Sequence, residues 1–189
     1  MQLEIKFAGF GGQGVMLTGK LLAEAAMEEG KQVVWLPSYG PEMRGGTAYC
    51  TVVISDRPIG SPIVNNPGNL VAMNRPSLEK FAPMIRPGGN CLVNSSLIPI
   101  SCGRDDLIEV RLPCNAIAIE LNNPRASNMV ALGGIAALVN VCSIDTVEHI
   151  IRHEFKSKAK FIEANVAAMK RGAELAVTDA ARIRVEAVA

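Results

Sequence analysis

The sequence predicts an α/β fold: a Rossmann-like, mostly parallel sheet with helices on both faces, in a single domain over residues 1–189 with C-terminal helices. The chain opens with an apolar run over residues 3–7, a glycine-rich turn, and a helical rhythm from Val15 to Glu29. Strand-like and helix-like segments then alternate, as they do in parallel sheets. The composition, 49% hydrophobic but only 4% aromatic, is typical of Val, Ile, Leu and Ala packing in such a fold.

The first half of the chain supplies a helix and several strands. The helix over residues 15–29 ends at Gly30, a residue suited to the left-handed conformation that stops helices. A strand over residues 33–36 is expected to end at Pro37, because proline cannot donate to a ladder. Two further strands are predicted over residues 47–55 and 70–73.

The second half is richer in helices. Asp145 and Glu148 have the spacing of a capping box, which predicts a helix start at Asp145. The charge-free window over residues 126–144 has an apolar core too short to cross a bilayer, so it predicts a buried helix in which Gly133 and Gly134 allow close approach of another element. The remaining predictions are helices over residues 76–85, 115–121, 127–141 and 159–177, and strands over residues 91–94 and 107–112.

The glycine-rich turn is the first candidate binding site. Its glycines fit G-x-G-x-x-G, the spacing that lets a backbone approach a pyrophosphate at a helix N-terminus. The alternative is that they only permit a tight turn and close helix–sheet packing. No carboxylate or arginine stands at the end of the second strand to hold a ribose or its 2′-phosphate, so NAD(P) and FAD are disfavoured. The candidate residues of this turn are Gly9, Gly11, Gly12, Gln13 and Gly14.

A second candidate site is the loop over residues 39–47. Arg44 stands beside Gly45 and Gly46, and an arginine next to bare backbone N–H groups suits a carboxylate, a phosphate or an acidic chain of a partner. The loop follows the second strand, so we expect it beside the glycine turn, at the sheet edge where α/β proteins bind ligands. The alternative is a structural turn in which Arg44 pairs with Glu42.

Charge and cysteine content exclude several other classes. A formal net charge of +1 shows no footprint for nucleic acid or anionic lipid. The five cysteines form no C-x-x-C pair, so no zinc or iron–sulfur motif is present, and dispersed thiols without a signal peptide indicate a reducing, cytoplasmic location. His149 and His153 lie four residues apart, but no further ligand accompanies them, so solvated helix residues are favoured over a metal site. We identify no catalytic and no metal-ligating residue.

Four segments together give the chain a family resemblance. It resembles the gamma subunit of 2-oxoacid:ferredoxin oxidoreductases at residues 9–15 (GFGGQGV), 38–46 (SYGPEMRGG), 52–59 (VVISDRPI) and 123–133 (NPRASNMVALG). The second segment looks like the 2-oxoglutarate or branched-chain type. Met43, Gly46 and Thr47 depart from the version typical of the pyruvate type.

The resemblance implies a role inside a larger complex. Such a complex oxidatively decarboxylates a 2-oxoacid, here 2-oxoglutarate or a related acid, forms an acyl-CoA and reduces ferredoxin. The alpha and beta subunits carry thiamine diphosphate and Mg²⁺, and iron–sulfur clusters lie in beta or in a small ferredoxin-like delta subunit. The gamma chain binds no cofactor alone, and would serve assembly and the approach of coenzyme A.

Two other functions stay open. One is a stand-alone Rossmann-like nucleotide-binding oxidoreductase domain, which the missing ribose carboxylate disfavours. The other is a purely structural scaffold subunit that contacts no ligand. Protection of the assembled complex by coenzyme A separates a ligand-contacting subunit from a scaffold.

Overall fold

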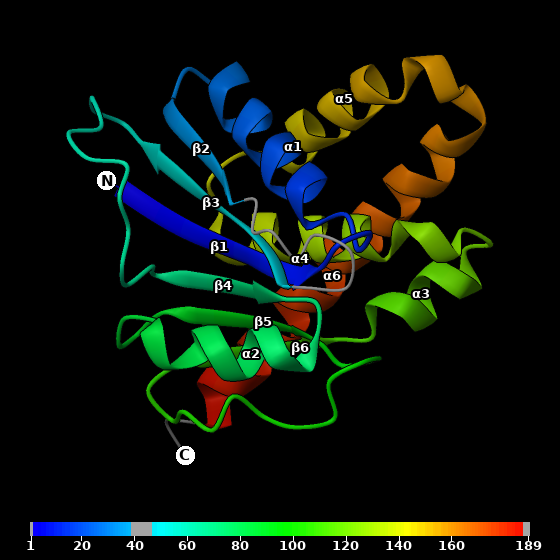
Figure 1. The fold of residues 1–189 in the computed structure, drawn as a ribbon. Helices are drawn as coiled ribbons and strands as arrows, with labels where there is room; N and C mark the ends of the chain where they lie inside the picture. The colour runs from blue at the N-terminus through cyan, green and yellow to red at the C-terminus, as the bar shows by residue number, and fades with distance from the viewer. Residues whose placement is uncertain (1, 39–46, 187–189) are drawn as a thin grey trace.

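The computed structural model describes residues 2–38 and 47–186, and these form a six-stranded sheet flanked by helices (Figure 1). The strand order is β2-β3-β1-β4-β5-β6. Strand β3 runs antiparallel to both β1 and β2, whereas β1, β4, β5 and β6 pair in parallel. The predicted mostly parallel sheet is therefore confirmed. The strands are β1 (Gln2–Phe10), β2 (Gln32–Ser38), β3 (Thr47–Ser55), β4 (Asn69–Ala72), β5 (Asn90–Asn94) and β6 (Ile108–Leu112).

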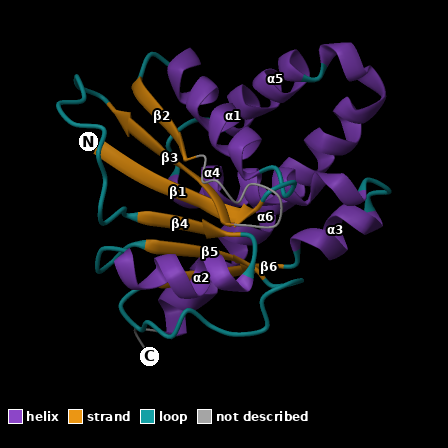
Figure 2. Cartoon of the chain, in the orientation of Figure 1, coloured by secondary structure: helices purple, strands orange, loops and turns teal. Residues whose placement is uncertain are grey.

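Helices cover both faces of this sheet, as predicted (Figure 2). On one face, α1, α4 and α6 bury a core that contains the odd-numbered side chains Ile5 and Phe7 of β1. On the other face, the short helix α2 covers a smaller core around Leu70 and Phe81. The helices are α1 (Val15–Glu28), α2 (Arg75–Phe81), α3 (Cys114–Glu120), α4 (Ser127–Val139), α5 (Ile144–Glu154) and α6 (Ile162–Glu186).

Strand β2 continues through Pro37 to Ser38, so the predicted end of this strand was wrong. The reason is its position in the sheet. β2 is an edge strand that pairs only with β3, and an edge strand tolerates a proline because one side of its backbone needs no partner.

Two helix starts also differ from the prediction. Helix α5 is capped by Ser143, whose Oγ accepts a hydrogen bond from the backbone N–H of Thr146 at 3.0 Å, so the predicted capping box at Asp145 was wrong. Helix α6 begins at Ile162, after an irregular 3₁₀ segment over Lys156–Phe161, and it continues to Glu186. Local sequence cues identified these helices but not their first turns.

The long helices α4 and α6 touch through glycine. A Cβ atom on Gly133 would lie 1.8 Å from the carbonyl oxygen of Met169, and one on Gly172 would lie 2.0 Å from that of Val130. Only glycine permits this contact, which confirms the predicted close approach at the buried helix. Among the described residues, no helix has the length and hydrophobicity needed to cross a membrane.

Candidate functional site

The turn between β1 and α1 depends on glycine for two different reasons. Gly12 and Gly14 adopt φ angles of +95° and +74°, which L side chains rarely adopt. A Cβ atom on Gly9 would instead lie 2.8 Å from Gln13 Oε1 and 3.0 Å from the Cβ of Met73. Gly11 has no positive φ and is exposed, so the backbone requirement falls on Gly12 and Gly14.

Gln13 fastens this turn to the neighbouring strand. Its Oε1 accepts hydrogen bonds from the backbone N–H of Phe10 at 2.6 Å and from Nδ2 of Asn74 at 3.2 Å. Its Nε2 donates to the carbonyl oxygen of Met73 at 3.1 Å. Through these three hydrogen bonds the Gln13 amide holds the end of β1 beside the end of β4. Gln13 therefore positions the turn.

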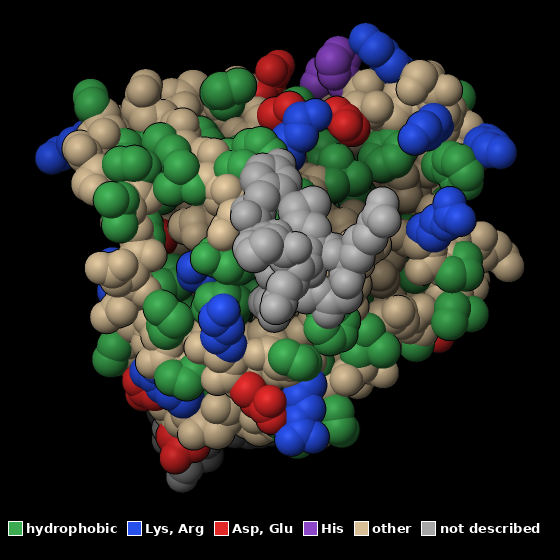
Figure 3. All heavy atoms as spheres, in the orientation of Figure 1, with side chains coloured by type: hydrophobic (Ala, Val, Ile, Leu, Met, Phe, Trp, Pro, Cys, Tyr) green, Lys and Arg blue, Asp and Glu red, His purple; other side chains and the backbone are tan. Residues whose placement is uncertain are grey.

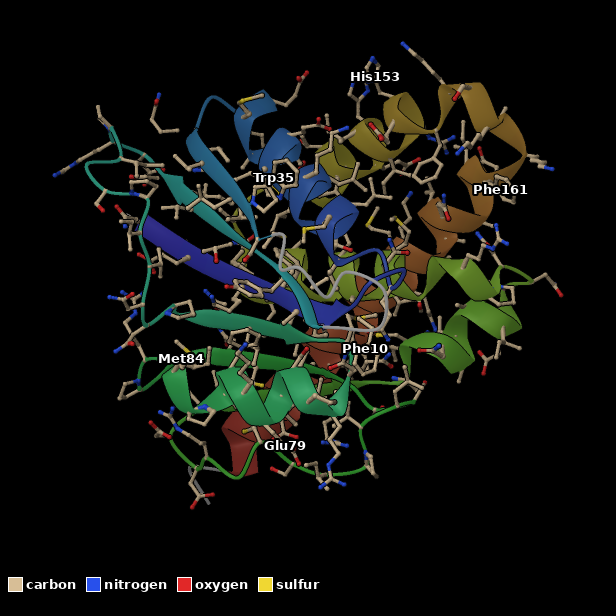
Figure 4. The ribbon with its side chains drawn as sticks, viewed as in Figure 1. Phe10, Trp35, Glu79, Met84, His153 and Phe161 are labelled. Carbon is tan, nitrogen blue, oxygen red and sulfur yellow. The ribbon has the colours of Figure 1, made fainter. Side chains whose placement is uncertain are left out.

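The glycine turn forms one wall of a cleft of about 510 Å³. The start of α4 forms another wall, and the segment before α6, which carries Phe161, closes a third side (Figure 4). A cleft of this size is in the range of small-molecule sites. Its described lining consists of Gly12, Gln13, Gly14, Leu17, Asn115, Asn123, Pro124, Arg125, Ser127, Asn128, Met129, Phe155, Lys158, Phe161 and Asn165.

Two helices begin at this cleft without a side-chain cap. Gly14 is the N-cap of α1 and Ala126 is the N-cap of α4, and neither residue supplies a capping oxygen. The first N–H groups of a helix have no partner within the helix, and the helix dipole places partial positive charge there. Two such ends beside one cleft make it a favourable place for an anion.

Asn128 is the polar side chain best placed to contact a ligand. It is only 6% exposed, it lines the cleft, and it makes no side-chain hydrogen bond to a described residue. Its Nδ2 lies so close to the turn that a Cβ on Gly14 would approach it to 2.4 Å. None of its amide atoms is among the fully buried polar atoms that lack a partner, so the amide is open to the cleft and a ligand there can reach it.

The other polar groups of the cleft divide into a fixed pair and two cations. Asn123 donates from Nδ2 to Oδ1 of Asn165 at 3.0 Å, and both residues are buried, so this pair braces α6 against the loop before α4. Arg125 and Lys158 are exposed at the cleft, and the described lining contains no carboxylate. The charge of the lining therefore favours a phosphate or a carboxylate.

The structure places the sequence-predicted residues as follows. Gly12, Gln13 and Gly14 line the cleft, whereas Gly9 and Gly11 lie in the same turn but outside the lining. Arg44, Gly45 and Gly46 lie outside the described residues. The positions that flank their loop are known, since Thr47 pairs with Phe10 and Ser38 pairs with Tyr49 at the strand ends nearest the glycine turn.

Sequence reasoning missed the residues from α4 and α6. The signal that could have found them was the segment NPRASNM at residues 123–129, which supplies Asn123, Arg125 and Asn128. The same segment is one of the four that carry the family resemblance. Its polar residues precede and begin a buried apolar helix, and a helix N-terminus is a favourable place for an anion.

The histidines and the buried cysteines Cys50, Cys114 and Cys142 contribute little chemistry here. His149 and His153 are exposed on α5, with His153 directed away from the molecule (Figure 4), and no group of three potential metal ligands occurs among the described residues. Burial raises the pKa of the Cys50, Cys114 and Cys142 thiols to about 12. These thiols stay protonated near neutral pH, which makes them poor nucleophiles.

Most of the chain matches one family model. Residues 4–175 match the family described as pyruvate ferredoxin/flavodoxin oxidoreductase. The ketoisovalerate oxidoreductase subunit VorA of Methanothermobacter marburgensis is 41% identical over 93% of this chain, but the chain spans only 37% of that relative's length. The 2-oxoglutarate synthase subunit KorC of Methanocaldococcus jannaschii is 36% identical over 93% of this chain and 95% of the relative.

Solved structures share the fold. The gamma subunit of a keto/oxoacid ferredoxin oxidoreductase from Geobacter sulfurreducens has a TM-score of 0.84 and 31% identity, and the match covers 95% of this chain and 98% of that one. A 2-oxoglutarate:ferredoxin oxidoreductase from Magnetococcus marinus, solved with 2-oxoglutarate, coenzyme A and succinyl-CoA bound, has a TM-score of 0.83 and 25% identity. That match covers 94% of this chain but 31% of the Magnetococcus chain.

Proposed function

The chain belongs to the pyruvate ferredoxin/flavodoxin oxidoreductase family, and on this ground we propose that it is the gamma subunit of a multi-subunit 2-oxoacid:ferredoxin oxidoreductase. The matches to KorC and to the Geobacter gamma subunit, which cover 95% and 98% of those chains, support the gamma-type assignment. The proposal treats residues 1–189 as one gamma-type domain. Its partners are the alpha and beta subunits and a ferredoxin-like delta subunit, in the cytoplasm.

The proposed reaction is the oxidative decarboxylation of a 2-oxoacid to an acyl-CoA with reduction of ferredoxin. We favour 2-oxoglutarate because the KorC relative matches this chain along almost its whole length. A branched-chain acid such as ketoisovalerate is the second candidate, because the VorA relative has the higher identity. Rates of the purified complex with each acid would decide between them.

We further propose that the cleft receives a phosphate group of coenzyme A. The observation that carries this proposal is the Asn128 amide, which faces the cleft from the first turn of α4, makes no hydrogen bond to a described residue and lies close to Gly14 at the start of α1. Coenzyme A is a phosphorylated substrate, and Arg125 and Lys158 supply positive charge at the same cleft. In this role the chain binds and orients the substrate, whereas thiamine diphosphate, Mg²⁺ and iron–sulfur clusters belong to the other subunits.

The test measures coenzyme A kinetics in the reconstituted complex. Arg125→Ala removes a cation from the cleft. Asn128→Asp replaces the Asn128 amide with a negatively charged carboxylate of nearly the same shape. Loss of a charge-assisted hydrogen bond costs about 1.5–3 kcal/mol, so we expect the KM for coenzyme A to rise roughly ten- to a hundredfold. The KM for the 2-oxoacid and the assembly of the complex should stay unchanged.

Arg171→Ala is the matched control, since Arg171 is an exposed arginine of α6 that pairs with Glu174 and does not line the cleft. Wild-type coenzyme A kinetics in both cleft variants, with the complex intact, would identify the chain as a scaffold subunit instead.

A further inference from the structure

Two lysines share a pair of aromatic rings on the face of the sheet that carries α2. The Nζ of Lys6 lies 4.7 Å from the ring centroid of Tyr49 and 4.9 Å from that of Phe81. The Nζ of Lys80 lies 5.9 Å and 5.2 Å from the same two centroids. The two ring centroids lie 5.1 Å apart and the ring planes are tilted by 60°, so both ammonium groups contact the same aromatic pair.

The topology explains why these residues meet. Lys6 on β1 pairs with Thr51 on β3, and the next pair on the same face is Ala8 with Tyr49. Helix α2 packs against β1 and β4 and brings Phe81 and Lys80 over that face. Four residues from three elements therefore converge, and none of them lines the cleft.

Lys6 is unusual because it is a buried cation without an anion. The residue is only 6% exposed, and neither its ammonium nor that of Lys80 forms an ion pair with a described residue. Burial lowers the pKa of Lys6, and the neighbouring Lys80 ammonium lowers it further. Attraction to the ring faces offsets part of this cost, but a carboxylate would offset more.

The described carboxylates closest to the two lysines in sequence form ion pairs with arginines. Glu4, two residues before Lys6, binds Arg86, and its Oε1 accepts from Gln2 at 2.9 Å. Glu79, next to Lys80, accepts from Nε of Arg75 at 2.7 Å and lies on the outer side of α2 (Figure 4). The ammonium groups of Lys6 and Lys80 can therefore form an ion pair with a carboxylate that comes from outside the described part of the chain.

The surface around the two lysines suits a protein better than a small ion. In the described part of the chain no helix covers β2 and β3 on this face (Figures 1 and 2). Leu36, which pairs with Thr51, is 38% exposed, and Val34 and Tyr49 are half-buried. Hydrophobic side chains gather over these strands in the space-filling view (Figure 3), as they do at protein interfaces.

We propose that this face docks another subunit of the complex, and that an acidic side chain of that subunit enters between Lys6 and Lys80. The apolar side chains of β2 and β3 would pack against the partner around this ion pair. The inference rests on the proposed function only in requiring a multi-subunit complex, and it is independent of the coenzyme A cleft.

Carbodiimide coupling of the purified complex tests the contact directly, because this reagent joins a lysine to a carboxylate that it touches. We expect an amide between Lys6 or Lys80 and an Asp or Glu of another subunit, identified by mass spectrometry. The Lys170–Glu148 ion pair within this chain is the internal control for the chemistry. An intact complex that yields the control cross-link but none from Lys6 or Lys80 would overturn the inference and leave the proposed function standing.

Variants test whether the contact matters for assembly. Lys80→Met and Lys6→Met keep the aliphatic stem and remove the charge, so we expect the chain to bind its partner subunits at least tenfold more weakly. Lys170→Met makes the same change on an exposed lysine of α6 and should assemble as wild type. Thermal melting of the isolated variants shows whether either substitution impairs folding. Lys80 is exposed, so we expect Lys80→Met to melt at the same temperature as wild type.

Wild-type assembly by both variants would also overturn the inference. If those variants in addition abolish binding of inorganic phosphate to the isolated chain, the two lysines form a small-anion site instead. If the chain co-purifies with no other subunit, this inference and the proposed function fail together.

Discussion

Single residues determine the geometry of the cleft, and Gly14 shows how. Its φ of +74° suits glycine. A Cβ atom at this position would lie 2.4 Å from Nδ2 of Asn128, so a methyl group here would displace the Asn128 amide. Gly30 has nearly the same φ, +78°, but a Cβ atom there would meet nothing within 4 Å. The two positions therefore separate backbone strain from steric conflict.

We predict that Gly14→Ala destabilises the chain more than Gly30→Ala. A left-handed alanine costs roughly 1–2 kcal/mol, and this is the whole expected effect at Gly30. At Gly14 the conflict with Asn128 adds to it. Urea denaturation of both variants gives the comparison, and equal losses of stability would show that Asn128 moves aside without cost.

Arg44 also belongs to the residue scale, although it lies outside the described residues. Its loop leaves β2 and enters β3 beside the glycine turn, so a directional contact with coenzyme A or with a partner subunit remains our prediction. We expect Arg44→Ala to weaken one of these contacts roughly ten- to a hundredfold. Arg44→Lys should be only partly tolerated, because lysine lacks the bidentate geometry.

Kinetics and assembly assays tell the two Arg44 contacts apart. A higher KM for coenzyme A in an intact complex indicates the substrate, whereas weaker assembly with an unchanged KM indicates the partner. Wild-type values for both quantities would make Arg44 an ordinary loop residue.

Among the secondary-structure elements, the junction between α1 and α5 depends on Glu29. This residue follows α1, and its Oε1 accepts hydrogen bonds from the backbone N–H of Ser143 at 2.8 Å and from Oγ1 of Thr146 at 2.7 Å. These bonds tie the end of one helix to the start of another. They also lower the pKa of Glu29 below its ordinary value of 4.5.

We predict a pH-dependent loss of stability in Glu29→Gln. A carboxyl whose pKa is lower in the folded state stabilises the fold above its ordinary pKa, and this contribution disappears as the pH falls through the folded pKa. The variant should therefore be less stable at pH 7, by on the order of 0.5 kcal/mol for an exposed hydrogen bond, and should match wild type in strong acid. Denaturation curves at several pH values measure the difference.

Glu28→Gln, a change in an exposed neighbour on α1, is the control and should leave the pH dependence as in wild type. A stability difference for Glu29→Gln that is constant with pH would show that the carboxylate charge is irrelevant.

The whole molecule departs from an ordinary dinucleotide-binding fold in its strand order. Strand β3 lies between β1 and β2, so the end of β2 is one strand further from the glycine turn than adjacent strands would be. Each strand adds about 4.8 Å. The position from which a carboxylate holds the ribose is therefore displaced, in addition to lacking a carboxylate at Pro37 and Ser38.

We accordingly predict that the isolated chain binds neither NADH nor FAD with micromolar affinity. Calorimetric titration of the purified chain measures this. A micromolar dissociation constant for either nucleotide would favour the stand-alone oxidoreductase domain over the subunit.

Local sequence patterns were sufficient to predict the fold class and most of the helices and strands. Alternating apolar runs predicted β3 and β4, and the glycines predicted the turn before α1, because these features depend on neighbours along the chain. The predictions for the end of β2 and for the first turns of α5 and α6 were wrong. Each of these features depends on a distant partner or on the edge position of a strand.

The strand order and the composition of the cleft depend on packing between distant parts of the chain. Gly14, Asn128 and Lys158 meet there although more than a hundred residues separate the first two, and no local period encodes such a contact. The same holds for Lys6 and Lys80, which share two rings only because α2 folds back over β1. Packing of the sheet and helices brings these side chains together, so the candidate site became visible only in the folded chain.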